Sequence, residues 1–249
     1  MRLKTLALLF LAAPVFAAAP RITNGSLQTV ASLSQAPANG WIGYAFQTAK
    51  PLSISCCDDG ISIHSSDSGD RVAYVFARFS AGEVERVRIG SGECALDAKG
   101  RPVGWVENVS PNDSIAFLRG IAERVAEHAA DGALLALSLH DGAVDALIDI
   151  ARHNPSAKVR GKALFWLSQQ AGEKAAAALR DAVENDPEEH VRAKAVFGIS
   201  QLPNDESIPL LIDLLKHNRS REVRKKAAFW LGQKNDPRAL AAIEEILRQ

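Results

Sequence analysis

The side chains of this 249-residue chain that could do chemistry are three cysteines, six histidines and one dense run of cations. Cys56, Cys57 and Cys94 share a stretch rich in strand-forming residues. Export, predicted below from the first residues, makes a disulfide the default, and a bond between adjacent cysteines is strained. We predict a structural disulfide between Cys57 and Cys94, with Cys56 as the alternative partner and one thiol left over. Redox or metal chemistry would need a Cys-x-x-Cys motif or several histidines, and only His64 is near.

The histidines do not form a metal motif. Glu127-His128 and Glu189-His190 place a carboxylate beside an imidazole, but Glu189 also precedes a predicted helix, where an acidic residue complements the macrodipole. The chain contains no Gly-x-Ser-x-Gly elbow, phosphate loop or dinucleotide fingerprint. The sequence therefore predicts no catalytic residue, no metal site and no cofactor.

The cationic run lies close to a predicted helix N-terminus, where positive charge is mildly unfavourable. Arg224 within it is assigned below to contacts between repeats. The remaining four cations are candidate contacts for an acidic partner protein or an anionic envelope polymer, and a solvated face is the alternative; they are Arg219, Arg221, Lys225 and Lys226. The whole chain has 29 basic and 29 acidic residues, so its net charge gives no indication of nucleic-acid binding.

A sequence motif of eleven residues, which we call the phrase, occurs three times and must position these side chains. Its copies are Val159–Gln169, Val191–Gln201 and Val223–Gln233, and each begins 32 residues after the last. A fixed period of roughly 20–50 residues is typical of a solenoid, in which each supersecondary unit stacks on the next.

Each repeat predicts two amphipathic helices, with the phrase forming the first and a second following after a turn. Asp236 before Pro237 is a good helix N-cap. A more divergent copy of the phrase begins near Ala133. Ser110 as N-cap, with Asp113 in the first turn, predicts the start of the first helix. We expect an α-solenoid of about four helical hairpins over residues 109–249.

The turns before the repeated phrase resemble those of a known repeat family. Asn154-Pro155, Asp186-Pro187 and Asn218 each stand six residues before an arginine of the phrase. A hairpin of this length with these residues resembles the short HEAT repeats of phycobilisome-lyase-like proteins, over roughly the last 100 residues. The resemblance implies a ladder of bonds between adjacent repeats, with asparagine in place of aspartate at two rungs. Its members would be Asn154, Arg160, Asp186, Arg192, Asn218 and Arg224.

Aromatic residues recur in the phrase as Phe165-Trp166, Phe197 and Phe229-Trp230. We expect them to form core between hairpins, with a binding stripe as the alternative. Gly198 replaces the tryptophan of the middle copy, which leaves either a shallow pocket or room for a large neighbour. Gln169, Gln201 and Gln233 end their helices, either as caps or as a polar row.

The N-terminal part has a different organisation. Residues 1–17 contain basic residues, an apolar run and small residues, which predicts a secretory signal peptide. Residues 18–39 are expected to form a loose arm, and residues 40–108 a small disulfide-stapled antiparallel β domain that packs on the first helices. Its strands are expected at residues 41–46, 71–79, 85–89 and 103–106.

The sequence therefore predicts an α+β protein in which a small N-terminal antiparallel β domain precedes a HEAT-like solenoid. The expected function is a protein–protein interaction scaffold or adaptor in the bacterial cell envelope, periplasmic or secreted, without membrane insertion or nucleic acid. One alternative is an enzyme, because relatives of these repeats are bilin lyases or iron hydroxylases. The other is ligand binding by the β domain. The sequence specifies neither the partner nor the oligomeric state.

Overall fold

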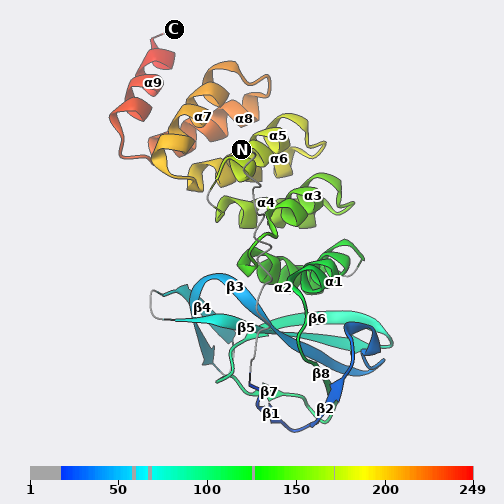
Figure 1. Cartoon of the computed structure of the whole chain (residues 1–249). Coiled ribbons are helices and arrows are strands. Elements are labelled where there is room, and N and C mark those ends of the chain that lie inside the picture. Colours follow the sequence, from blue (N-terminus) through cyan, green and yellow to red (C-terminus); the bar gives the residue numbers. More distant parts are fainter. Residues whose placement is uncertain (1–17, 58–59, 67–68, 125–126, 171, 249) are drawn as a thin grey trace, which may run out of the picture.

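A computed structural model describes residues 18–248 except residues 58–59, 67–68, 125–126 and 171. A sheet lies at one end of the molecule, and pairs of helices stack away from it toward the C-terminus (Figure 1). The predicted signal peptide lies outside the described residues.

The main sheet has the strand order β2-β8-β3-β5-β6, with β4 paired to β3. These strands are β2 (Ser26–Val30), β3 (Gly40–Cys57), β4 (Gly60–Ser65), β5 (Asp70–Ser80), β6 (Glu83–Gly90) and β8 (Pro102–Val106). Strands β3 to β6 pair antiparallel, as expected, but β8 joins β3 in parallel and β2 joins β8 in parallel. The sheet is therefore mixed. Between β6 and β8 the chain passes through β7 (Leu96–Asp97), and β8 then runs in the same direction as β3 (Figure 1).

Residues 18–39 are not a loose arm. They contain β1 (Ile22–Thr23), which pairs with β7, the edge strand β2, and a short 3-10 turn at Leu33–Gln35. The Tyr74 hydroxyl also donates a hydrogen bond to the Ala18 carbonyl over 2.6 Å. Strand β2 was not predicted because most of its residues are exposed, and an edge strand exposed on both faces shows no apolar alternation.

Alternating side chains of the sheet serve two separate cores. Ile42, Tyr44 and Val75 belong to the face that packs on the helices. Trp41 and Phe76 belong to the opposite face. This division follows from the two-residue period of a strand.

The described part of the array contains helices α1 to α9. They are α1 (Pro111–Arg124), α2 (Glu127–Leu139), α3 (Val144–His153), α4 (Ala157–Ser168), α5 (Glu173–Asn185), α6 (Glu189–Gln201), α7 (Asn204–His217), α8 (Arg221–Gly232) and α9 (Pro237–Leu247). Ser156, Ser220 and Asp236 cap their helices by accepting bonds from backbone amides, as the sequence predicts for Asp236. An α-solenoid with an N-terminal β-sheet region is thus confirmed.

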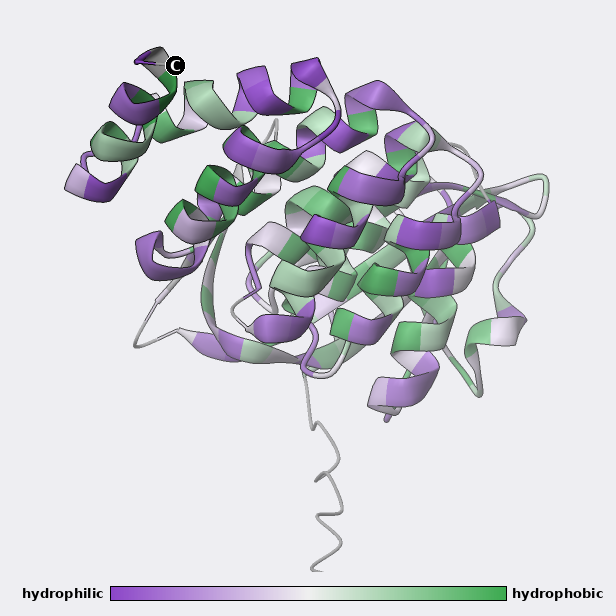
Figure 2. Cartoon of the chain, turned by 90° about the horizontal axis from the view of Figure 1, so that it is seen from above, coloured by the Kyte–Doolittle hydropathy of each residue, from purple (hydrophilic) through white to green (hydrophobic). Residues whose placement is uncertain are grey.

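The helices form two layers. Helices α2, α4, α6 and α8 pack side by side in what we call the motif layer, and α1, α3, α5, α7 and α9 form the flanking layer. Each copy of the repeated phrase packs more extensively on the helix before it than on the helix after it, so the phrase is the second helix of its hairpin rather than the first. Seen down the stack, hydrophobic residues gather on the sides of the helices turned toward the interior (Figure 2).

One apolar core runs from the sheet into the last helix, and it includes Ile42, Leu134, Leu164, Ile199 and Ala239. Helix α2 lies close on β6 because Gly132 has no side chain; a Cβ there would collide with the carbonyl oxygen of Val87. The β region and the array therefore share one apolar interior. Among the described helices, none combines the length and the apolar character needed to cross a bilayer.

Candidate functional site

The aromatic residues of the repeated phrase are not core. The side chains of Phe165 and Phe229 are 40% and 54% exposed, and Trp166, Phe197 and Trp230 are half-buried. The expectation of core was wrong for Phe165 and Phe229, because Leu164, Leu167 and their counterparts already fill the space between the layers, whereas Trp166 and Trp230 still pack against that core. The five aromatic side chains instead lie on the outer face of the motif layer, and we call them the aromatic row.

The members of the aromatic row touch one another across the repeats. The rings of Phe165 and Phe197 are nearly parallel, with an interplanar angle of 3° and centroids 6.5 Å apart. Trp230 lies against Phe197 with centroids 5.1 Å apart. Trp166 and Phe229 extend the row at its two ends through edge contacts. The result is a continuous aromatic surface across α4, α6 and α8.

Gly198 does not open a pocket between the two tryptophans. It is buried, and a Cβ there would collide with the side chain of Leu179 on α5. The residue therefore permits close packing of α6 between the layers. Of the two alternatives, room for a large neighbour is the one that the structure supports.

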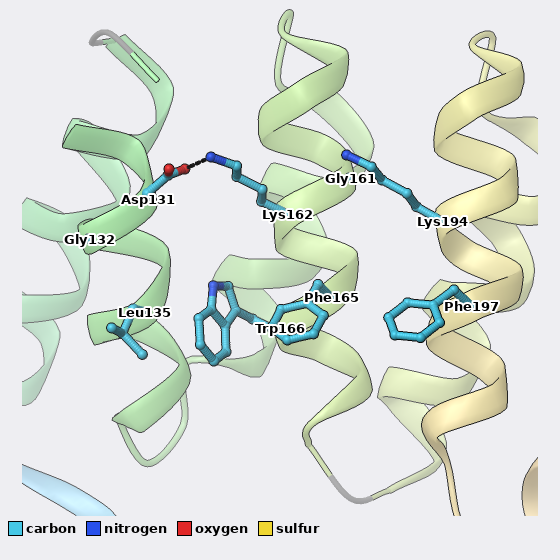
Figure 3. Close-up of a pocket in the computed structure, with 9 residues that line it drawn as sticks. All are labelled: Asp131, Gly132, Leu135, Gly161, Lys162, Phe165, Trp166, Lys194 and Phe197. Atoms are coloured by element: carbon cyan, nitrogen blue, oxygen red, sulfur yellow. Dashed lines mark hydrogen bonds and ion pairs between the residues drawn. The ribbon is translucent and has the colours of Figure 1, made fainter. Parts of the chain in front are cut away.

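A second row lies beside the aromatic row. Lys162, Lys194 and Lys226 occupy equivalent positions of the three repeats, and we call them the lysine row. Lys162 forms an ion pair with Asp131 of α2 (Figure 3). Lys226 Nζ lies 3.9 Å from Glu222 on its own helix, and Lys194 is exposed with no ion pair to another described residue.

The two rows border a pocket of about 530 Å³. Its walls come from three successive helices of the motif layer, and its side chains point to the same side of that layer (Figure 3). It is lined by Asp131, Gly132, Leu135, Gly161, Lys162, Phe165, Trp166, Lys194 and Phe197. The floor is apolar and the rim carries charges, which is typical of a binding surface.

A second hollow of about 420 Å³ adjoins the first toward the sheet. Leu135 and Trp166 line both. The far wall of the second hollow comes from β3 and β4, through Lys50, Leu52 and Ile63. Together the two hollows make a groove that begins at the β3–β4 hairpin and follows the motif layer.

The cations selected from the sequence are divided between two places. Lys226 belongs to the lysine row, whereas Arg219, Arg221 and Lys225 are exposed at the start of α8. Sequence reasoning missed Lys162 and Lys194 because neither lies in a run of cations as dense as the one around Lys226. The 32-residue period could have found them, since they recur in register with Lys226.

One rung of the ladder is a buried ion pair. Arg160 Nε donates to Asp186 Oδ2 over 2.8 Å and Nη2 donates to Oδ1 over 3.0 Å. Burial alone would raise the pKa of Asp186, but hydrogen bonds from Arg160 and from the Glu188 amide bring that pKa below its usual range. The pair joins α4 to the turn before α6.

The other rungs differ. Asn154 and Asn218 donate to oxygen atoms of the preceding repeat. Arg192 and Arg224 donate to the carbonyls of Asp186 and Asn218, each within its own turn, over 2.7 and 2.6 Å. Arg160 makes the same bond to the Asn154 carbonyl over 2.9 Å, so the buried rung differs by its added ion pair. For Arg192 the counterpart of Asp186 is Asn218, whose amide has no charge to attract the guanidinium.

A buried polar cluster joins the sheet to the first hairpin. The Ser114 hydroxyl donates to the Tyr44 oxygen over 2.8 Å, which leaves the Ser114 oxygen to accept from His140 Nε2 at 2.8 Å. Burial lowers the pKa of His140 to about 4 and raises the pKa of Tyr44. Ser114 has no exposed surface, so no substrate can reach its hydroxyl in this structure, and the contact is a structural tie.

The predicted disulfide lies partly outside the described side chains. Cys94 is buried, and its Sγ lies 3.4 Å from Ser91 Oγ. The side chains of Cys56 and Cys57 are not among those described, so the pairing of Cys57 with Cys94 stays a prediction. Within the described part of the chain, no group of three or more His, Cys, Asp or Glu side chains could hold a metal ion.

Comparison with known families identifies the helical array. The family model for HEAT repeats matches residues 144–228, and that for the PBS lyase HEAT-like repeat matches residues 223–249. This chain is a HEAT-repeat protein. It is of the phycobilisome-lyase-like type, as the turns before the repeated phrase predict. A search of curated proteins found no match.

HEAT repeats are generally protein-interaction scaffolds, so the family favours a protein partner for this HEAT-repeat protein. The matches begin at residue 144 and therefore cover α4, α6 and α8, which carry both rows. The sheet, α1 and α2 lie before the matched residues. The wall that β3 and β4 add to the groove is thus a feature of this chain beyond its HEAT repeats.

Proposed function

We propose that this HEAT-repeat protein is a scaffold that holds a polypeptide segment of a partner protein along the groove. The observation that carries the proposal is the aromatic row, whose rings are exposed or half-buried although a phenylalanine recurs at the same position in every copy of the phrase. Large exposed aromatic side chains are enriched where proteins bind each other. A contiguous apolar surface of this kind is costly to leave in water unless something covers it.

The form of the groove favours a chain over a small molecule. The aromatic row spans three repeats, and the groove continues past it to the β3–β4 hairpin. A small ligand would use one enclosed pocket with convergent polar groups. A surface that repeats one ring and one lysine per helical hairpin matches a partner that is itself extended.

The proposal includes a location. The basic and apolar pattern of residues 1–17 supports export, which would place the partner in the bacterial cell envelope. An adaptor there would present its groove to a second envelope protein. The test is therefore made in the cell rather than with purified components alone.

Site-specific photo-crosslinking tests the proposal. Benzoylphenylalanine in place of Phe165 or Phe229 keeps an aromatic ring on the row, and the same group in place of Leu240 is the matched control. Leu240 is 60% exposed but lies on α9 of the flanking layer. One specific crosslinked protein from positions 165 and 229, absent from position 240, is the expected result. Crosslinks of equal yield from all three positions would contradict it.

A further inference from the structure

We infer that the segment bound in the groove is acidic and extended, with carboxylates that contact Lys194 and Lys226 of the lysine row and apolar residues that contact the rings beside them. The inference rests on the proposed function and specifies the chemistry of its partner. Its basis is the charge along the lysine row, the register of the two rows, and the spacing of the helices.

The charge along the row is unbalanced. Asp131 neutralises Lys162 at the end near the sheet. Glu222 lies 3.9 Å from Lys226, which is at the limit of an ion pair, and both side chains are partly exposed. Lys194, between them, forms no ion pair with a described residue. One unpaired and one weakly paired lysine therefore lie beside an apolar surface, where a carboxylate gains more than it would in open water.

The Lys194 side chain occupies the space that a side chain at position 161 would fill, because that residue is glycine. A Cβ at Gly161 would lie 2.7 Å from Lys194 Cδ and 3.1 Å from its Nζ, so the lysine stem rests on α4 and its ammonium reaches the rim of the 530 Å³ pocket. The ammonium thereby lies near the pocket that Phe165 and Phe197 line (Figure 3). A ligand in the pocket would meet charge and aromatic surface together.

The spacing of the repeats favours an extended ligand. Packed helices lie about 8–10 Å apart, so one lysine recurs at about that interval, while the rings of Phe165 and Phe197 lean toward each other with centroids 6.5 Å apart. A polyproline II segment advances about 9.3 Å in one turn of three residues. One residue of each turn can face the lysine row, one the aromatic row and one the solvent. An α-helical partner advances about 1.5 Å per residue, so it would place only about one residue in seven against each row.

Fluorescence anisotropy with the full-length protein and labelled peptides tests this. The probe is a peptide of about twelve residues, four polyproline II turns, that repeats Pro-Leu-Glu. The matched peptides carry Gln or Lys in place of Glu, and a fourth is an α-helical peptide with Glu and Leu at seven-residue intervals. We expect the Glu peptide to bind about tenfold or more tightly than the Gln peptide, with no binding of the Lys peptide and weakening by salt.

Variants locate the contact. Lys194→Gln with Lys226→Gln should remove the preference for Glu over Gln. Arg180→Gln is the matched control, because Arg180 is an exposed cation on α5 of the flanking layer, and it should leave the preference unchanged. Equal effects of the two sets of changes would overturn the assignment to the lysine row.

The other outcomes are also decisive. Equal binding of the Glu and Gln peptides, or no binding of the Glu peptide, overturns the inference, while crosslinking at positions 165 and 229 would still support the scaffold. Tighter binding of the helical peptide overturns the extended form. Concentration-dependent dimerisation in sedimentation, abolished by Phe229→Ala, would identify a second copy as the occupant and overturn it as well.

Discussion

The aromatic row and the junction between the sheet and the first hairpin use similar residue types in opposite ways. At the junction the Phe46 ring stacks on His140 with centroids 4.1 Å apart, and the buried hydroxyls of Ser114 and Tyr44 find partners. In the aromatic row the rings contact one another across the repeats, and Lys194 beside them forms no ion pair with a described residue. At the junction the hydroxyls of Ser114 and Tyr44 and the Nε2 of His140 all have hydrogen-bond partners inside the protein, whereas the row exposes aromatic surface and a lysine charge to the solvent.

The two regions also differ in whether their residues recur from one repeat to the next. The junction occurs once, and its residues are scattered from Tyr44 to His140. Phe165, Phe197 and Phe229 recur at the same position of each copy, although that position is exposed in two copies and half-buried in the third. Repetition at an exposed position is what a surface that binds a repeating ligand requires, and folding alone does not require it.

Two adjacent residues of α4 provide the largest expected effect. Leu164→Ala should lower the free energy of unfolding by about 2–5 kcal/mol, because Leu164 is fully buried and leaves a cavity. Phe165→Ala should lower it by only about 1–2 kcal/mol, since its ring is already 40% exposed. Urea unfolding followed by far-UV circular dichroism measures both. Equal losses would mean that the aromatic row is core after all.

The pH dependence of stability should come from the junction. His140 has a pKa of about 4 in the folded protein against 6.5 for an exposed histidine, so acid protonates the unfolded chain first. Stability should be level above pH 6.5 and fall as the pH drops toward 4, by up to about 3 kcal/mol. His140→Gln should reduce this pH dependence in urea titrations between pH 7 and 4. A variant with the same slope as the original protein would contradict the assignment.

Removing the central hydroxyl of the junction is expected to cost somewhat less. Ser114→Ala leaves the Tyr44 oxygen and His140 Nε2 without their common partner, and an unsatisfied buried group costs about 1–3 kcal/mol. Thermal and urea unfolding of the full chain measure the loss. Ser110→Ala, at the exposed start of α1, is the control and should cost about 1 kcal/mol through its lost cap. A smaller loss at position 114 than at 110 would show that the cluster is not a structural tie.

Much of the fold could be predicted from the sequence, and the site only in part. The period of the phrase and the N-caps at Ser110 and Asp236 indicated the helices, because these signals are local. The exposed face could not be assigned, since the phrase from Val159 to Gln169 has large apolar residues on most sides of its helix. Which side faces the flanking layer depends on how the hairpins pair. The strand β2 was missed for a related reason, because its residues are mostly exposed and its partner β8 is distant in the chain.

The smallest expected effect concerns the cations at the start of α8. Replacing Arg221, Lys225 and Lys226 together with Gln should change the free energy of unfolding by less than about 0.5 kcal/mol, or roughly 1–2 °C in Tm. All three are at least partly exposed, and the one ion pair among them, Lys226 with Glu222 at 3.9 Å, is weak. Differential scanning calorimetry measures the change. The original protein and the variant should melt alike yet differ in binding of the Glu peptide, because Lys226 belongs to the lysine row. A loss of several degrees would instead place these cations with the junction, as groups that the fold itself requires.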